Sequence, residues 1–281
     1  MNGGIRPRKS LGQHFLRDDR IARRIVASVD PRPGELVLEI GPGEGALTRH
    51  LAATDARLVL VDIDSRVIER MRAAFGGRAE VRQQDILEVD PRTVVREHAV
   101  ERLRVLGNIP YYITTPIFFH FLDHRNVVQD LTLMLQREVA RRLAAKPGSK
   151  TYGILSVLAG LLADVRLLFE VQPGSFYPRP AVTSAVVQVT MLPHPRFPIP
   201  DEEFFRRVVR TAFGQRRKTL RNSLRALRGT QTEAVDGATL ARRPEELSVQ
   251  EFVELASVLW SSRRIGPTPT VAAVSGPQGN R

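Results

Sequence analysis

The sequence contains no cysteine, which excludes disulfide bonds, thiolate metal sites and cysteine nucleophiles. It has no apolar run close to the roughly 20 residues that a membrane-spanning helix needs. Its first residues also lack the apolar core of a secretory signal. We therefore expect no membrane partner and a cytoplasmic location.

A metal-ligand set is also missing. His120 and His124 stand four residues apart on an expected helix, but no third ligand accompanies them and the glutamate of the zinc-protease motif is absent. We interpret both histidines as packing residues and assign no metal.

Lysine and acidic residues are scarce. Only four of the 42 basic residues are lysine, and 30 acidic residues leave a formal net charge of +12. Such a charge favours a polyanion, above all nucleic acid, and the planar fork of arginine suits phosphate. A GC-rich genome would also favour arginine codons, so the position of the charge is more informative than the residue type.

In the first two thirds of the chain, apolar strands alternate with amphipathic helices. Expected strands cover residues 35–40, 57–62, 79–84 and 130–135. Helices are expected over 46–53 and 63–75, between the first three strands, and over 137–144, after the last. This alternation is typical of an α/β domain with a parallel sheet covered on both faces. Two later β-rich runs, 165–171 and 182–190, fit an antiparallel pair at the sheet edge.

The composition changes after residue 193. Four prolines between residues 193 and 200 indicate a stiff linker, and beyond it the apolar residues follow helical spacing. We therefore predict a domain over residues 1–198 and a small all-helical domain over residues 199–265. The tail, 266–281, has too few apolar residues to pack and is expected to be disordered.

A short polar motif, Asn108-Ile109-Pro110-Tyr111, follows a buried strand. The Asn108 side-chain carbonyl and a backbone carbonyl beside Pro110 can each accept one hydrogen from an amino group, while Tyr111 offers a face for a nucleobase. An ordinary strand-to-helix turn would also use asparagine and proline. The motif alone does not decide between these readings.

The residues of a nucleoside site lie at earlier strand ends. The turn Gly41-Pro42-Gly43-Glu44-Gly45 lets a ligand approach the backbone, and Asp62 ends the next strand, where it can hold ribose hydroxyls. Asp85 follows the strand after that and can accept from an adenine amino group. The glycine spacing departs from the dinucleotide fingerprint, and a carboxylate at Glu39 would repel a pyrophosphate and attract a cationic amino-acid end. These features favour S-adenosylmethionine over NAD.

Five ordered blocks between about residue 8 and residue 259 resemble the ribosomal RNA adenine dimethyltransferases of the KsgA family. The blocks are Ser10–Leu16, Glu39–Gly43, Gly107–Tyr111, Phe176–Pro180 and Ala212–Leu224. The resemblance implies a Rossmann-like methyltransferase domain with a mostly parallel seven-stranded sheet. It also implies an enzyme that dimethylates N6 of two adjacent adenosines near the 3′ end of small-subunit rRNA during ribosome assembly.

The resemblance places cofactor contacts on specific residues of this chain. They are His14, Leu16, Gly41, Asp62, Asp85 and Asn108. Two of them depart from the commonest family pattern, which has asparagine at the position of His14 and glutamate at that of Asp62. The proposed catalytic residues are Asn108, Pro110 and Tyr111, and Phe176 is expected to stack on the second face of the target base.

A basic run in the helical domain is the expected RNA surface. Between Phe204 and Gly229 there are nine basic residues and no acid, among them Arg216, Arg217, Lys218 and Arg221. A charge run is usually a solvated face, but one sign over this length on an amphipathic segment favours contact with phosphates.

Three other functions remain open at this point: an Erm-type enzyme acting on large-subunit rRNA, a non-catalytic RNA-binding assembly factor, and a DNA adenine methyltransferase. The first and last blocks favour small-subunit rRNA over the Erm type, the intact Asn108–Tyr111 motif argues against a non-catalytic factor, and no target-recognition insert supports DNA. Nothing in the sequence demands more than a monomer.

Overall fold

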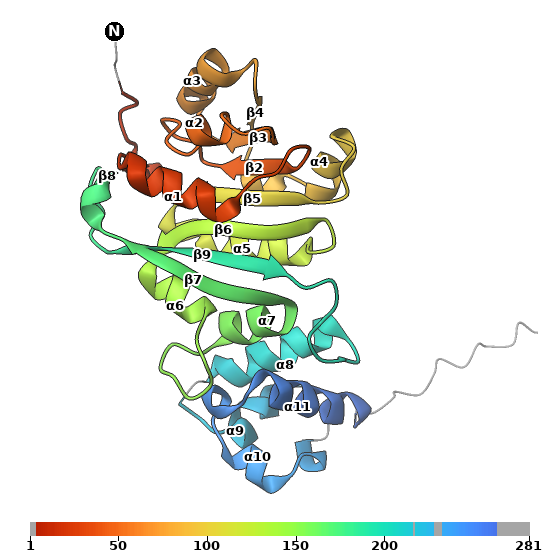
Figure 1. Ribbon diagram of the computed structural model, residues 1–281. Coiled ribbons are helices and arrows are strands. Elements are labelled where there is room, and N and C mark those ends of the chain that lie inside the picture. Colours follow the sequence, from red (N-terminus) through yellow and green to blue (C-terminus); the bar gives the residue numbers. More distant parts are fainter. Residues whose placement is uncertain (1–3, 216, 228–231, 263–281) are drawn as a thin grey trace, which may run out of the picture. The chain divides into compact units, whose positions relative to one another are not determined.

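The computed structural model describes residues 4–215, 217–227 and 232–262 (Figure 1). The chain divides into two compact units, Met1–Pro198 and Ile199–Arg281. Arg216 and the tail, for which the sequence made predictions, lie outside the described residues. Within the described part, no helix is both long and apolar enough to cross a membrane.

The first unit is built on a seven-stranded sheet with the order β4-β3-β2-β5-β6-β9-β7. The first five strands of that order are parallel, whereas β9 runs antiparallel to both of its neighbours. The predicted mostly parallel seven-stranded sheet is therefore confirmed, with the antiparallel pairing at one edge. The strands are β2 (Leu36–Ile40), β3 (Arg57–Asp62), β4 (Glu80–Gln83), β5 (Leu103–Asn108), β6 (Val128–Gln136), β7 (Ala163–Val171) and β9 (Ser184–Met191).

Helices cover both faces of this sheet; α1 lies in front of it and α5 behind it in Figure 1. Both faces of β2 are therefore buried, which explains why all of its residues except Glu39 are apolar. The helices of this unit are α1 (Asp19–Val29), α2 (Thr48–Leu51), α3 (Ser65–Phe75), α4 (Pro91–Glu97), α5 (Thr114–Asp123), α6 (Arg137–Leu143) and α7 (Ile154–Leu162).

Two helices differ from the prediction. The helix expected over residues 46–53 is reduced to α2, because Gly43 and Gly45 adopt positive φ angles and extend the turn before it. Helix α4 was missed, although Asp90 caps its first turn and Pro91 occupies its first position, which are recognised start signals.

A small antiparallel ribbon of β1 (Phe15–Leu16) and β8 (Phe176–Tyr177) was also missed. It pairs Phe15 with Tyr177 and Leu16 with Phe176. Two residues a strand are too few to produce a readable alternation, so only the folded chain reveals this ribbon.

Among the described residues of the second unit, every secondary-structure element is a helix, as predicted. Its amphipathic helices α8 and α11 bury Phe204, Phe205 and Phe252. Its helices are α8 (Glu202–Gly214), α9 (Leu220–Ser223), α10 (Gly237–Ala241) and α11 (Val249–Ser261).

Candidate active site

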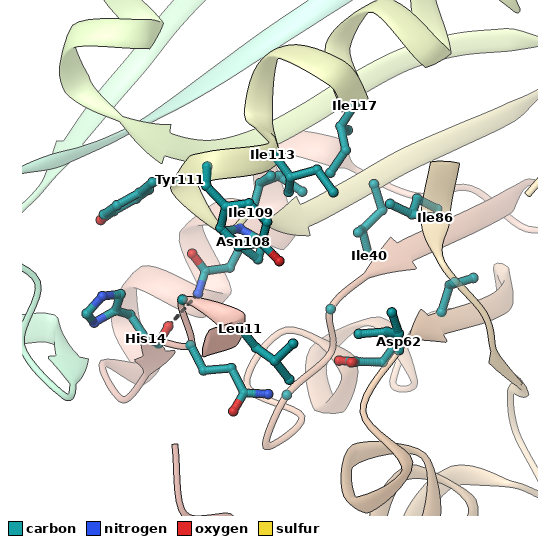
Figure 2. A pocket seen from close by; sticks show the side chains of 18 of the residues that line it. Leu11, His14, Ile40, Asp62, Ile86, Asn108, Ile109, Tyr111, Ile113 and Ile117 are labelled. Carbon is teal, nitrogen blue, oxygen red and sulfur yellow. Dashed lines mark hydrogen bonds between the residues drawn. The ribbon is translucent and has the colours of Figure 1, made fainter. Parts of the chain in front are cut away.

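A cavity lies beyond the carboxyl ends of β2, β3 and β5 (Figure 2). The register aligns these ends, since Ile40 pairs with Val61 of β3 on one side and with Gly107 of β5 on the other. The strand order reverses at β2, because β3 and β4 follow on one side of it and the chain then crosses to β5 on the other side. Open α/β folds bind ligands at such a reversal. The predicted residues that line the cavity are His14, Gly41, Asp62, Asp85, Asn108, Pro110 and Tyr111.

The glycine turn after β2 forms the floor. Gly41 and Gly43 have φ angles of 63° and 56°, in the left-handed region that glycine adopts without strain. A Cβ on Gly43 would lie 2.8 Å from Cδ1 of Phe15. Glycine is therefore needed here for the backbone conformation and for the close approach of the N-terminal segment.

Two carboxylates are held by the backbone at successive strand ends. Oδ1 of Asp62 accepts a hydrogen bond from the Asp64 N–H at 2.8 Å, and Oδ1 of Asp85 accepts one from the Leu87 N–H at 2.9 Å. Burial, reinforced by the nearby negative charge of Asp64, raises the pKa of Asp62 to about 6. The Asp62 carboxylate is thus poorly solvated and suited to accept from ligand hydroxyls.

Asn108 is oriented by the N-terminal segment. Its Nδ2 donates to the backbone carbonyl of His14 at 2.8 Å, the dashed contact in Figure 2. Because a carbonyl can only accept, this bond decides which end of the amide faces His14 and turns the Oδ1 acceptor elsewhere. The Ile109 N–H donates to the Met134 carbonyl at 3.0 Å, which fixes the backbone after Asn108.

Tyr111 is held in a half-buried position. Its hydroxyl lies 2.7 Å from Oγ of Ser184, and its ring stacks on the His14 ring with centroids 5.9 Å apart. Nδ1 of His14 in turn donates to the Pro178 carbonyl at 2.7 Å. The neighbouring Tyr112 is 65% exposed, so only the first of the two tyrosines is fixed by such contacts.

Leu16 and Phe176 do not line this cavity. They face each other in the β1–β8 ribbon, and only 4% and 5% of their respective surfaces are exposed. Leu16 lines a smaller adjoining cavity together with Gly41 and Gly43, whereas Phe176 packs in the hydrophobic core. In this conformation Phe176 is not the exposed second wall that the sequence suggested, because β-pairing turns its side chain into the core. Its contact with the base stays a prediction.

Glu39 is not the charged group that the sequence suggested. It is 1% exposed, and its Oε2 accepts a 2.7 Å hydrogen bond from Oγ1 of Thr48. Burial raises the pKa of Glu39 to about 8, so the side chain is mostly protonated at neutral pH. Glu39 therefore does not supply the negative charge that was expected to repel a pyrophosphate and to attract a cationic amino-acid end.

Apolar residues of the cavity were missed by the sequence reasoning. Ile40, Ile86 and Ile117 line it beside Asp62, and they provide the surface that a purine ring requires. Their sequence positions could have indicated this, since Ile40 directly precedes Gly41 and Ile86 directly follows Asp85. Aliphatic residues at strand ends are so common, however, that they do not distinguish a site from a core.

His120 and His124 both contact backbone carbonyls. Nε2 of His120 lies 2.9 Å from the Val89 carbonyl, and Nδ1 of His124 lies 2.8 Å from the His120 carbonyl. Across residues 4–215, 217–227 and 232–262, no group of three or more histidine and acidic side chains could hold a metal ion.

The described basic residues of the second unit mostly face solvent. Arg207, Arg210, Arg217, Lys218, Arg221 and Arg225 are exposed, while Arg206 is partly buried and pairs with Glu202 at 2.8 Å. Arg216 lies outside the described residues. The exposed set presents positive charge along one stretch of sequence, as a phosphate-binding surface requires.

The cavity fits S-adenosylmethionine. The glycine turn leaves room for close approach to the backbone, the two backbone-held carboxylates suit a ribose and an adenine amino group, and an aliphatic wall lies between them. An amide and a tyrosine for an acceptor amine lie at the adjacent strand end. The fold and the site together define a methyltransferase that uses S-adenosylmethionine.

Comparison with known proteins identifies the family. The model of the ribosomal RNA adenine dimethylase family matches residues 4–259, and the chain belongs to this family. It is 48% identical to ribosomal RNA small subunit methyltransferase A of Geobacter metallireducens, over 92% of this chain and 97% of that protein.

Two solved structures share the fold. A dimethyladenosine transferase from Plasmodium falciparum superposes with a TM-score of 0.71 at 24% identity, covering 86% of this chain and 96% of that one. The 23S rRNA methyltransferase ErmE gives a TM-score of 0.65 at 28% identity, covering 87% and 99%. The predicted family, fold, enzyme class and cofactor are therefore confirmed: the protein is an rRNA adenine methyltransferase that uses S-adenosylmethionine.

Proposed function

We propose that this enzyme dimethylates N6 of two adjacent adenosines near the 3′ end of small-subunit rRNA, as a cytoplasmic monomer acting on the assembling small subunit. The observation that carries the proposal is the hydrogen bond from Nδ2 of Asn108 to the His14 carbonyl, which assigns the amide oxygen of this cavity-lining residue to another partner. The relative from Geobacter metallireducens, named as a small-subunit rRNA methyltransferase, supports the choice of RNA.

Asn108 is proposed to hold the reacting amine. The N6 lone pair of adenine is delocalised into the ring, which makes the nitrogen a poor nucleophile. A hydrogen bond from the amino group to Oδ1 of Asn108, with a second to a backbone carbonyl, draws the nitrogen toward tetrahedral geometry and exposes the lone pair. Positioning of this kind supplies much of a catalytic rate enhancement.

The second acceptor is proposed to be the carbonyl of Ile109. The alternative, the Pro110 carbonyl, already accepts from the Ile113 N–H at 3.2 Å within the 3-10 helix Tyr111–Ile113. Pro110 then has a conformational role, because its φ of −56° starts this turn and so places the Tyr111 ring.

Tyr111 is proposed to stack on the target adenine. The contacts with Ser184 and His14 hold its ring before the RNA arrives, so little conformational entropy remains to be lost on binding. Base stacking on an aromatic ring contributes about 1–3 kcal/mol. Phe176 is proposed as the second stacking residue, which requires its side chain to leave the β1–β8 ribbon.

The cofactor is proposed to bind with its ribose at Asp62, its adenine at Asp85 and its amino-acid end near Gly41 and Leu16. When bound, S-adenosylmethionine supplies a methyl group attached to a positively charged sulfur. The methylated amine loses its proton readily to solvent, so no strong base is required from the protein. Lys218 and the exposed arginines 217 and 221 are proposed to bind RNA phosphates, as is Arg216.

The alternative is modification of large-subunit rRNA, which is supported by the 28% identity to ErmE, a protein named as a 23S rRNA methyltransferase. The higher identity to the small-subunit relative favours the proposal. The test is transfer of labelled methyl groups by the purified chain to two substrates, immature small subunits and naked 23S rRNA. We expect label on small subunits, located by mass spectrometry as dimethyladenosine near the 3′ end. Label on 23S rRNA alone would contradict the proposal, and binding of small subunits without transfer would indicate a non-catalytic factor.

A further inference from the structure

The N-terminal segment lines the cofactor cavity and is tied to the loop that follows β3. Gln13 Nε2 donates to Oδ2 of Asp64 at 3.0 Å, and Nη1 of Arg66 donates to the Arg6 carbonyl at 2.9 Å. Within the segment, the Arg8 N–H donates to Oε1 of Gln13 at 2.9 Å, which fixes the orientation of that amide. Residues 6–13 are thus joined to the loop between β3 and α3, although the two lie about 50 positions apart in sequence.

Asp64 is the centre of these contacts. It is 2% exposed, caps α3 by accepting from the Arg66 N–H, and forms an ion pair with the Arg66 guanidinium. Its own N–H donates to Oδ1 of Asp62 at 2.8 Å. The hydrogen bonds from Arg66 hold the pKa of Asp64 at about 2, so the carboxylate is ionised at neutral pH. A capping role explains the bond to the helix but does not explain the bond to Gln13.

The segments joined in this way both line the cavity. Leu11, Gly12 and Gln13 line it from the N-terminal segment, and Asp62 and Ile63 line it from the end of β3. Leu11 and Asp62 are labelled in Figure 2. A single buried residue, Asp64, therefore connects the carboxylate proposed to bind the ribose, through its backbone N–H, with the N-terminal segment that lines the cavity, through its side chain.

We propose that Asp64 and Arg66 form a latch that fastens residues 6–13 over the cavity and retains the bound cofactor. Asp64 is a positioning residue, since it acts through Gln13 and Asp62. The inference rests on the proposed function, because two methyl groups on one adenosine consume two cofactor molecules. The segment must then release and close again between the two transfers. Weakening the latch lowers affinity for the cofactor and speeds its exchange, with a much smaller effect on the transfer step.

The test is a double-mutant cycle on the full-length chain, with S-adenosylmethionine affinity measured by calorimetry. Asp64→Ser keeps a capping oxygen for α3 but removes the oxygen that binds Gln13. Gln13→Ala removes the other partner and leaves the cap intact. We expect each variant to weaken binding about five- to tenfold, and the double variant to bind no more weakly than the worse single one, because both remove the same contact. The single-turnover rate of methyl transfer at saturating cofactor should change less than about twofold, because saturation compensates for weaker cofactor binding.

Asp90→Ser is the matched control, since Asp90 caps α4 in the same way without contacting the N-terminal segment. If Asp64→Ser fails to fold, Gln13→Ala and Arg66→Ala, which leave the capping oxygen in place, decide the question. The latch would be refuted if the losses of affinity in the two single variants multiplied in the double variant. Unchanged affinity in the single variants would refute it as well. Failure of the wild-type chain to bind S-adenosylmethionine would instead overturn the proposed function.

Discussion

The two sides of the cavity are built in different ways. The cofactor side consists of consecutive strand ends, in which the glycine turn, Asp62 and Asp85 follow β2, β3 and β4 in chain order. The acceptor side joins remote segments, since His14 bonds to Pro178 across 164 positions and Tyr111 to Ser184 across 73. Pairing of the parallel strands places the polar residues of the cofactor side next to one another. The residues of the acceptor side come together only when several contacts between remote segments form as well.

This comparison suggests that substitutions on the cofactor side change binding, and that substitutions on the acceptor side change the transfer step. The largest effect is expected at Asn108. Replacing it with alanine removes the acceptor for the N6 amino group and should lower kcat about 100- to 1,000-fold, in the range found for loss of one preorganised polar contact. RNA affinity, measured by filter binding, should stay nearly unchanged, because phosphate contacts dominate it.

Asn126→Ala is the control for this variant, because Asn126 is exposed in the loop between α5 and β6. A near-normal rate for Asn108→Ala would refute its catalytic role.

The next effect is expected at Tyr111. Tyr111→Ala removes the stacking surface, which is worth about 1–3 kcal/mol, and should lower kcat/KM for the RNA by about 5- to 150-fold. Tyr111→Phe keeps the ring and loses only the contact with Ser184, so a loss of less than about tenfold is expected for one hydrogen bond. Steady-state kinetics of both variants with small subunits as substrate separates the effect of the ring from that of the hydroxyl. Equal losses would show that the hydroxyl, and not the ring face, is what matters.

On the cofactor side, the pH dependence of binding should reveal Asp62. Its pKa of about 6 means that the carboxylate is ionised at pH 7.5 and mostly protonated at pH 5. Ribose hydroxyls donate better to the ionised form, so S-adenosylmethionine should bind up to about tenfold more weakly at pH 5. Calorimetry across this range provides the measurement. Asp62→Asn should bind S-adenosylmethionine weakly at both pH 7.5 and pH 5. If Asp62→Asn instead keeps the pH dependence of wild type, a group other than Asp62 is responsible for it.

The smallest effect on activity is expected at Glu39, whose substitution changes stability instead. Its pKa is about 8 in the folded chain against 4.5 for an ordinary glutamate, so the folded state holds an extra proton between these values. The contribution of Glu39 is fully present below about pH 4.5 and is lost as the pH rises through 8. Wild type should therefore lose stability between pH 5 and 8, and Glu39→Gln should lose less.

Denaturant unfolding at several pH values measures this difference, with the exposed Glu101→Gln as control. A Glu39→Gln variant that loses stability as steeply as wild type would show that Glu39 ionises normally in the folded chain. An ionised Glu39 would then place a full negative charge on the cofactor side.

Much of the cofactor side was predictable because its signals are local. The bounds of β3 were predicted to the residue, and Gly41, Asp62 and Asp85 all line the cavity as the strand alternation implied. The acceptor side was predictable only for Asn108, Pro110 and Tyr111, which share one turn. The placement of Phe176 in the core, the protonation of Glu39 and the contacts of Asp64 were not predicted.

The sequence by itself determined the alternating strands and helices, the glycine turn and the excess of positive charge. These depend on neighbouring residues, or on a period that can be read along the chain. Only the tertiary structure decided which way the Asn108 amide points, which aromatic side chains are buried, and that Asp64 joins two walls of one cavity. Each of these depends on burial or on a partner far away in sequence, and the free energy of such a contact exists only after the chain has folded.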